Sequence, residues 1–368
     1  MIFEVLVTVV VVGGISAILS ALLSVSDAIV NNYGDVKITV NKKRNIDTTG
    51  GSTLLSTLGT EKIFLPSACG GKGSCGLCKA RVVTDIGPVF PTETPYLNKE
   101  EIKSGVRLAC QIKVKKDLEI EIPEELFNIR EYQARVISLH DVTYDIKELN
   151  LVLNGDISFK AGQYIQLVVP PYGKIKESTM RAYSISSPSS QKRTIQLLIR
   201  LVPNGIVTTY IHKHLNEGDE LRILGPFGEF YLRHSSSDIV FVAGGSGLAP
   251  VKAIVHEMVK TGFERKTYFF FGARTTADLM YTDLFRRIES KYDNFHYIPA
   301  LSAPDDSPGW KGETGLITDV MDSYLTKQGS REREAYLCGS PGMIEACING
   351  VLKKHGLTEN EIFYDKFG

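Results

Sequence analysis

The sequence predicts a multi-domain chain with an amino-terminal transmembrane helix, a small strand-rich domain, an antiparallel β-barrel and an α/β domain on an open parallel sheet. Three observations support this fold class. Residues 5–26 carry no charge, short strands with Gly, Pro and Asn turns follow over 132–232, and strands alternate with helices over 236–368. Since 368 residues exceed one ordinary core, we expect separate domains at 34–126, 132–232 and 236–368 behind an anchor at 1–30.

Charge and cysteine usage narrow the function classes. The 42 basic and 42 acidic residues cancel, and the sequence has no basic stripe with interleaved aromatic residues, so nothing favours nucleic acid as a partner. Cys338 and Cys347 stand far from the other four cysteines. This arrangement fits a reducing compartment rather than a disulfide scaffold.

The uncharged segment Val5–Ser26 is long enough to cross a bilayer as a helix. A cleaved signal peptide is the alternative, but Glu4 and the absence of Lys or Arg before the segment oppose it. The basic run 42–44 on the carboxyl side favours a cytoplasmic body, unless it belongs to a hairpin of the next domain. Small residues at Gly13, Ala17 and Ala21 either permit packing on another membrane helix or are ordinary content of such a helix.

The domain at 34–126 surrounds a glycine-rich cysteine loop. Cys69, Cys75 and Cys78 have the spacing C-x5-C-x2-C, and 31 residues separate Cys78 from Cys110. Four thiolates, three of them on a loop whose glycines allow the backbone to approach inorganic sulfur, are the donor set of a 2Fe-2S cluster. A structural zinc site usually pairs two C-x2-C knuckles, and only one is present. The expected strands here are Val36–Val40, Arg81–Thr84 and Leu118–Ile122.

The barrel at 132–232 carries a run suited to a flavin. We expect strands at Gln133–Ser138, Glu148–Leu153, Tyr164–Val169 and Ile195–Leu201. Arg181, Tyr183 and Ser184 offer a cation for phosphates, a flat ring for stacking and a hydroxyl for a ring nitrogen. The turn with Gly205, Val207 and Thr208 opens a short helix whose N-terminus suits a pyrophosphate. An ordinary barrel strand and turn are the alternative.

Two loops at 236–368 follow apolar strands of the predicted parallel sheet. The run Gly244, Gly245, Ser246, Gly247, Leu248, Ala249, Pro250 leads from strand Ile239–Ala243 into a helix at Leu248–Thr261, where glycines and a helix N-terminus suit a dinucleotide phosphate. Further strands are expected at Thr267–Phe271, Ala335–Cys338 and Ile362–Tyr364. Cys338, Gly339, Pro341 and Met343 end a strand at the same edge, where Cys338 is either beside a nicotinamide or a small buried residue. His212 and His214 lack a third ligand, so we interpret them as surface or core residues.

These motifs in this order closely resemble the NADH-oxidising F subunits of sodium-translocating NADH:quinone reductases, within the ferredoxin-NAD(P)+ reductase superfamily. The carrying runs are Ser67 to Cys78, Arg107 to Gln111, Arg181 to Ser184, Gly225 to Phe230, Phe271 to Arg274 and Tyr364 to Gly368. The resemblance implies a β-grasp ferredoxin domain, an FAD barrel and a Rossmann-like NAD domain. In the family, a long insertion typically separates the residues that match Pro171 and Arg181, and this chain has nine residues there.

The resemblance also implies roles for residues. Cys69, Cys75, Cys78 and Cys110 would hold the cluster. FAD and NADH would be held by Arg181, Tyr183, Ser184, Arg200, Gly205, Val207, Thr208, Phe367, Gly244, Gly245, Gly247, Pro250, Arg274, Cys338, Gly339, Pro341 and Met343, with Ser184 and Cys338 near the reacting atoms. Preference for NADH is implied likewise, although Arg274 could accept a 2′-phosphate.

The expected activity is electron transfer from NADH through FAD and the 2Fe-2S cluster to a membrane-embedded redox partner. The chain would be a single-pass protein of the inner membrane with its catalytic domains in the cytoplasm. One alternative is the reductase component of a di-iron monooxygenase or another oxidoreductase, which shares the three modules. Another is a membrane scaffold that binds the cofactors without turnover.

Overall fold

The computed structural model describes residues 11–22, 24 and 33–367 of the chain. Residues 11–22 are helical, and the rest of the predicted anchor at 1–30 lies almost entirely outside the described residues. No helix in the described part of the chain is both long and apolar enough to cross a membrane. Two compact units divide the chain, 1–128 and 129–368, and each is described by itself.

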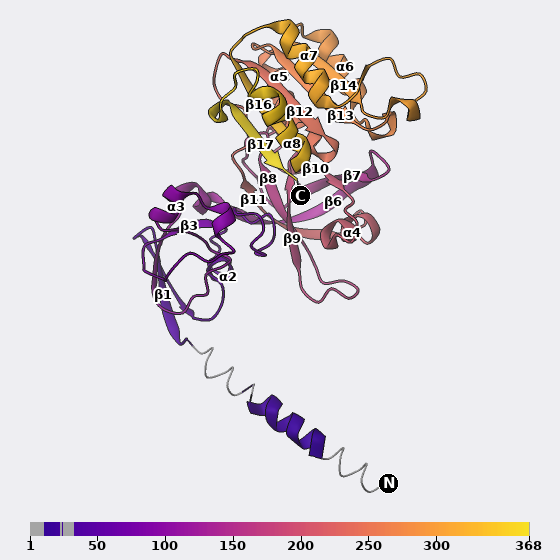
Figure 1. Cartoon of the computed structure of the whole chain (residues 1–368). Coiled ribbons are helices and arrows are strands. Elements are labelled where there is room, and N and C mark those ends of the chain that lie inside the picture. The colour runs from indigo at the N-terminus through magenta and orange to yellow at the C-terminus, as the bar shows by residue number, and fades with distance from the viewer. Residues whose placement is uncertain (1–10, 23, 25–32, 368) are drawn as a thin grey trace, which may run out of the picture. The chain divides into compact units, whose positions relative to one another are not determined.

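The first unit is a five-stranded sheet in the order β2-β1-β5-β3-β4 (Figure 1). Its strands are β1 Asp35–Val40, β2 Arg44–Thr49, β3 Lys79–Val82, β4 Val106–Leu108 and β5 Leu118–Glu121, and its helices are α2 Leu54–Thr60 and α3 Lys99–Lys103. Short 3-10 turns lie at Thr94–Tyr96 and Glu124–Asn128. Only β1 and β5 pair in parallel. Alternate residues of β1, Val36, Ile38 and Val40, are buried against α2 in one apolar core, as the alternating sequence predicted.

Two details of this unit differ from the sequence-based expectation. The strand expected at Arg81–Thr84 is β3, Lys79–Val82. It starts directly after Cys78 because its ladder with β4 runs from Lys79 to Arg81. The basic run 42–44 belongs to the β1–β2 hairpin, where Val40 pairs with Arg44. Its charges therefore give no independent support for a membrane orientation.

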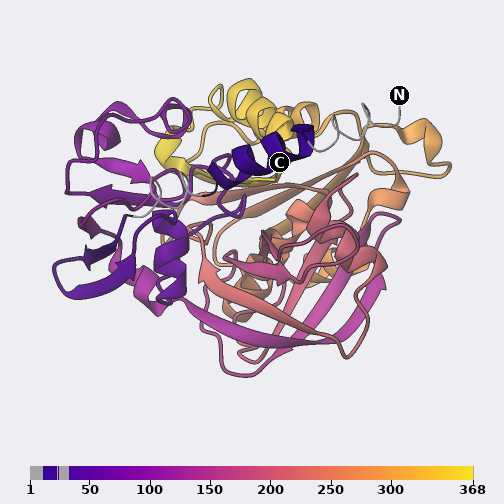
Figure 2. The same cartoon turned by 90° about the horizontal axis from the view of Figure 1, so that it is seen from below.

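The barrel region forms a six-stranded antiparallel sheet in the order β10-β7-β6-β11-β8-β9. Its elements are β6 Arg130–Asp141, β7 Ile146–Leu153, β8 Tyr164–Val169, β9 Thr179–Ser184, β10 Thr194–Arg200, α4 Ile206–Lys213 and β11 Glu220–Phe227. An isolated bridge between Ile185 and Leu197 links the two edge strands, so the sheet curls into a half-barrel (Figure 2). The antiparallel barrel predicted from the strand spacing is thereby confirmed.

The last region is a parallel sheet in the order β15-β14-β13-β12-β16-β17 with helices on its faces. Its strands are β12 Asp238–Gly244, β13 Thr267–Ala273, β14 Phe295–Leu301, β15 Glu313–Thr314, β16 Arg333–Gly339 and β17 Ile362–Lys366. Its helices are α5 Leu248–Thr261, α6 Thr282–Lys291, α7 Ile317–Gln328 and α8 Pro341–Cys347, with a π-helical turn at Ile348–Leu352 and 3-10 turns at Gly245–Gly247, Thr276–Asp278, Pro304–Asp306 and Glu359–Glu361.

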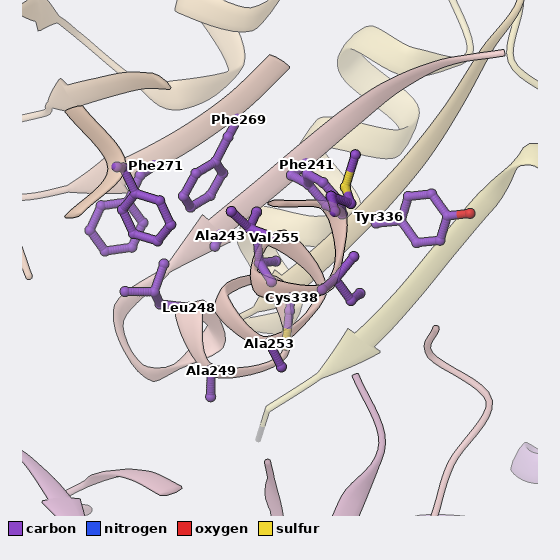
Figure 3. Packing of buried hydrophobic residues seen from close by; sticks show 14 of the residues in the cluster. Phe241, Ala243, Leu248, Ala249, Ala253, Val255, Phe269, Phe271, Tyr336 and Cys338 are labelled. Carbon is purple, nitrogen blue, oxygen red and sulfur yellow. The ribbon is translucent and has the colours of Figure 1, made fainter. Parts of the chain in front are cut away.

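The central strand β12 explains both the core and the position of the loops. Phe241 and Ala243 belong to one apolar cluster with α5, and Val240 and Val242 to another with α7 and α8. Figure 3 shows the first cluster, including Cys338. Because β13 and β16 flank β12 on opposite sides, the strand order reverses there. Crevices that bind ligands in α/β sheets lie at the carboxyl ends of strands at such a point.

Candidate functional site

The four cysteines of the first unit lie in two pairs. The Sγ atoms of Cys69 and Cys75 are 3.4 Å apart, and the side chains of Cys78 and Cys110 are in hydrogen-bonding contact. The Ala109 N–H donates to the Cys78 carbonyl at 2.8 Å, so the β3–β4 ladder brings the fourth cysteine to the loop. Among the residues with described positions, no three potential ligands converge on a single ion. Two pairs of thiolates fit a 2Fe-2S cluster, which takes two ligands on each iron.

The loop backbone has the conformation that its glycines allow. Gly70, Gly71, Gly73 and Gly76 have φ values between 67° and 86°, a region that other residues seldom adopt. A Cβ on Gly76 would lie 2.7 Å from the Tyr96 side chain. The loop therefore depends on glycine both for its backbone conformation and for its packing.

A buried ion pair supports the strand that precedes Cys110. The Arg107 guanidinium donates to the Glu93 carboxylate at 2.6 Å, and the side chains are 4% and 0% exposed. Glu93 also accepts from the N–H groups of Leu108 and Phe90, at 2.8 and 2.9 Å. Burial alone would raise the pKa of Glu93, but the Arg107 and backbone hydrogen bonds hold the pKa below its ordinary value.

Strand β9 carries the three residues predicted to hold a flavin. Its register with β8 pairs Arg181 with Leu167, Tyr183 with Ile165 and Ser184 with Tyr164. Since side chains alternate along a strand, Arg181 and Tyr183 share one face and Ser184 points to the other. Ser184 is also the last residue of β9. A ligand that contacts all three must therefore pass over the carboxyl end of this strand.

Two buried polar atoms beside β9 have no hydrogen-bond partner within the protein. They are Ser184 Oγ and Gln166 Nε2, and their residues are 4% and 1% exposed. Gln166 is on β8 opposite Ala182, so it shares a face with Ser184. Buried donors are almost always satisfied in native proteins. These atoms fit the polar edge of a bound flavin.

The other predicted flavin residues cluster around the turn before α4. Gly205 is the N-cap of α4, Val207 is buried in the barrel core, and the Thr208 hydroxyl accepts from the Val202 N–H at 3.1 Å. The Thr208 hydroxyl thus closes the turn. Arg200, at the end of β10, pairs with Asp145 at 2.6 Å. The N-terminus of α4 and the Arg200 guanidinium are the groups suited to phosphate here.

The two loops of the α/β region meet at the switch point. Gly247 is the N-cap of α5, and Pro250 is buried in its first turn. A Cβ on Gly247 would lie 2.2 Å from the Cys338 carbonyl oxygen, so only glycine fits between the loop and β16. Pro341 is the first residue of α8, and the Phe367 N–H donates to the Gly339 carbonyl at 2.8 Å. The structure therefore brings together the glycine loop, the Cys338 loop and the end of β17.

A cavity of about 250 Å³ opens over this edge of the sheet. Of the predicted residues, Arg200, Gly245, Arg274 and Met343 line it. Its remaining walls are Thr143, Asp145, Ile146, Gly272, Ala273, Asp278, Ala300, Ser302, Gly315, Leu316 and Ile317. The half-barrel and the α/β region thus both contribute to it. The positive groups are paired with carboxylates, because Arg200 contacts Asp145 and the 75% exposed Arg274 lies 3.9 Å from Asp306.

Burial sets the protonation of several groups near the loops. Cys338 is fully buried, and burial raises the pKa of its thiol well above the usual value, with the Asp365 charge adding to the shift. Burial raises the pKa of Asp365, opposite Cys338 in the sheet, to about 6. Burial also raises the pKa of the Tyr183 hydroxyl. These groups are neutral hydrogen-bonding or packing elements rather than charges at pH 7, apart from Asp365, which ionises in part.

Sequence reasoning missed several residues that shape the cavity. Asp145 pairs with Arg200 and accepts from the Thr143 hydroxyl at 3.0 Å. Asp278 accepts from Tyr144 across the two regions at 3.1 Å. Both carboxylates lie in loops without a motif, so no local signal marks them. His212 Nε2 contacts the Ile199 carbonyl at 2.9 Å, and His214 packs against Tyr172.

Fold, donor sets and domain matches together define an NAD(P)H-dependent FAD/2Fe-2S oxidoreductase of the ferredoxin-NAD(P)+ reductase type. A 2Fe-2S iron-sulfur cluster binding domain matches residues 38–115, an oxidoreductase FAD-binding domain 133–231, and an oxidoreductase NAD-binding domain 241–348. The chain belongs to the family of the F subunits of Na(+)-translocating NADH-quinone reductases.

Membership in that family rests on full-length similarity. The F subunit of this enzyme in Klebsiella pneumoniae subsp. pneumoniae is 35% identical over 99% of this chain and all of the relative, and that of Neisseria meningitidis is 34% identical over 91% and 92%. Among solved structures, the cytochrome P450 reductase GcoB of Amycolatopsis has a TM-score of 0.73 at 28% identity, covering 90% of this chain and 98% of that one. The ferredoxin reductase in carbazole 1,9a-dioxygenase has the same fold, with a TM-score of 0.68 at 23% identity over 91% and 98%.

Proposed function

We propose that this protein is the electron-input subunit of a complex like the sodium-translocating NADH:quinone reductase. It oxidises NADH and delivers electrons through FAD and the 2Fe-2S cluster to a redox partner in the inner membrane. The observation that carries this proposal is the identity of about one third along the whole chain to relatives that are the F subunits of that enzyme. A single anchor within residues 1–30, with the catalytic domains in the cytoplasm, completes the proposal.

The division into modules follows from the chemistry of the cofactors. A flavin accepts two electrons from NADH together and releases them singly to a cluster that carries one at a time. In the proposed assignment, Cys69, Cys75, Cys78 and Cys110 ligate the irons. Arg200 and the N-terminus of α4 face flavin phosphates together with Arg181, while Tyr183 and Phe367 flank the ring and Ser184 donates to it.

The glycine loop and the Cys338 loop form the proposed NADH site. The N-terminus of α5 behind Gly244, Gly245, Gly247 and Pro250 offers N–H groups and positive potential to the pyrophosphate. Gly339, Pro341 and Met343 form the wall that faces the nicotinamide, with Cys338 buried beneath. The pairing of Arg274 with Asp306 and the presence of Asp278 in the same cavity disfavour a 2′-phosphate, which supports NADH over NADPH.

A second candidate is the reductase component of a monooxygenase or another soluble oxidoreductase. The similarity to the cytochrome P450 reductase of Amycolatopsis over nearly its whole length favours it. So does the short segment between Pro171 and Arg181, where the F-subunit family typically has a long insertion. The two candidates share the catalytic modules and differ in the acceptor.

Purification from native membranes with a tag on the carboxyl end tests the proposal. We expect the protein to co-purify with membrane-embedded redox subunits and to reduce a quinone with NADH. A chain that begins at Tyr33 should keep NADH oxidation with ferricyanide, because no proposed cofactor contact precedes Cys69, but should lose quinone reduction in membranes. A native protein found without membrane partners, reducing a soluble oxygenase instead, would establish the second candidate.

A further inference from the structure

A closed ring of five polar side chains joins the α/β region to the half-barrel, outside the residues that line the cavity. Lys252 is in the first turns of α5, and Tyr281 lies just before α6. Glu148 and Asn150 are on β7, and Gln196 is on β10. Residues that are far apart in the sequence therefore meet at one place.

The contacts run around the ring without a gap. Lys252 Nζ donates to Gln196 Oε1, and Gln196 Nε2 donates to Asn150 Oδ1 at 3.0 Å. Asn150 Nδ2 donates to Glu148 Oε1 at 2.9 Å, and the Tyr281 hydroxyl donates to Glu148 Oε2. The Lys252 ammonium lies 4.4 Å from the centre of the Tyr281 ring, within the range of a cation–π interaction.

The ring holds one buried cation and one buried anion. Lys252 is 5% exposed and Glu148 is 7% exposed. Burial lowers the pKa of Lys252 to about 8, against the opposing effect of the Glu148 charge. Loss of either charge leaves the other uncompensated in a region that water does not reach, which is more costly than the pair itself.

The backbone of Tyr281 is strained to complete the ring. Its φ is 56°, a left-handed conformation that a bulky residue adopts only where its surroundings determine it. The contacts that determine it are the hydroxyl bond to Glu148 and the Lys252 ammonium against its ring. This strain indicates a position fixed by the ring rather than by the local sequence.

We propose that Lys252 is a positioning residue for hydride transfer, because its ammonium closes the ring that fixes α5 on the half-barrel strands. Gly247, the N-cap of α5, precedes Lys252 by little more than one helical turn. A shift of the helix therefore moves the dinucleotide loop relative to β9. The inference rests on the proposed function only in taking that loop as the NADH site and β9 as the flavin site.

A second contact on the same helix supports this role. The N–H and the hydroxyl of Ser189, in the loop between β9 and β10, both donate to Glu257 Oε1 at 2.8 Å. Lys260 pairs with the other oxygen of Glu257 at 2.7 Å and is 48% exposed. Lys260 thus offers a matched control, since it is a lysine of α5 that lies outside the ring.

The experiment compares Lys252→Met with Lys260→Met in the full chain loaded with FAD and cluster. We expect the maximal rate of flavin reduction by NADH in stopped flow to fall by about tenfold or more in Lys252→Met, because displacements near 1 Å can reduce such rates by about a hundredfold. Flavin content should match the wild type, and amides of the first turns of α5 should exchange hydrogen faster before NADH is added. Lys260→Met should behave as the wild type in all three measurements.

A pH profile separates positioning from a merely structural role. The charged and titratable groups around Lys252 are Glu148 on β7, His140 on β6, Tyr281 before α6, and His256, Glu257 and Lys260 on α5. As pH rises through about 8, the ammonium loses its proton, so wild-type flavin reduction should slow there. Lys252→Met should show no such decline, and adding Glu148→Gln to Lys252→Met should cost nothing further or restore part of the rate.

Tyr281→Phe provides a milder variant if Lys252→Met retains no flavin. It removes only the hydroxyl bond to Glu148, so we expect a smaller fall in the rate, of about two- to fivefold, with normal flavin content. Wild-type rates in Lys252→Met, or in Tyr281→Phe where the first variant does not fold, would overturn the proposal, as would an unchanged alkaline decline in Lys252→Met. A wild-type chain that does not reduce its flavin with NADH would instead overturn the proposed function.

Discussion

Replacing Glu93 with Gln should weaken the cluster domain more than any surface change of the same kind. The carboxylate is fully buried and accepts from both sides of the Arg107 fork and from two backbone N–H groups. A neutral amide has the same shape but leaves the Arg107 charge without its counter-ion. The segment 87–93 and strand β4, which leads to Cys110, are held together by this pair.

The size of the effect follows from the burial. Breaking a buried pair by removing one partner costs about 3–5 kcal/mol, and the lower end applies because the amide oxygen still accepts one hydrogen bond. In a domain of about 60–100 residues each kcal/mol moves the melting temperature by about 4–8 °C. We therefore expect a fall of about 12–24 °C in Glu93→Gln.

The assay follows visible circular dichroism of the cluster during heating at one fixed scan rate. Glu121→Gln is the matched control, because it removes the exposed pair with Arg81, in which the side chains of Arg81 and Glu121 are 52% and 36% exposed. Such pairs contribute about 0–1 kcal/mol, so its melting temperature should fall by less than about 8 °C. Equal melting temperatures for the two variants would refute the claim that Glu93 anchors the ligand strand.

Two further predictions concern the α/β region. Gly247→Ala forces a Cβ to within 2.2 Å of the Cys338 carbonyl, so kcat/KM for NADH should fall by about a hundredfold with flavin and cluster retained, while Gly350→Ala, which meets nothing within 4 Å, should not change it. The pKa of Asp365 is raised by burial to about 6, so the stability of its neutral form is lost as pH rises from 3.8 through 6. Asp365→Asn should melt like the wild type near pH 4 and higher at pH 7, and parallel melting curves across pH would contradict this.

The sequence predicted features that depend on neighbours in the chain. Strand alternation in β1, the helix Leu248–Thr261 and the glycine-rich loops all follow from local periodicity or from residues that only glycine can replace, and the structure has them where they were expected. The start of β3 could not be predicted because it is set by pairing with β4, more than 20 residues further along the chain. Ser184 gave a similar difficulty, since its face depends on where β9 ends.

The ring around Lys252 had no signal in the sequence at all. Its five members span positions 148 to 281 and share no spacing, residue type or repeat. Lysine in the first turns of an amphipathic helix is usually exposed, and only the docking of α5 on β10 buries this one. Long-range polar contacts of this kind become visible only when the tertiary structure places the elements together.

This contrast has a consequence for how the protein works. The groups proposed to hold FAD, NADH and the cluster are largely backbone N–H groups, glycines and thiolates within short loops, and such loops bind cofactors on any scaffold that presents them. Hydride transfer further requires two of these loops, on different domains, to stand at a fixed distance. Local motifs cannot provide that distance, because it is a property of the interface. The ring of Lys252, Gln196, Asn150, Glu148 and Tyr281 joins the elements that carry the two loops, so substitutions there should separate binding of the cofactors from transfer between them.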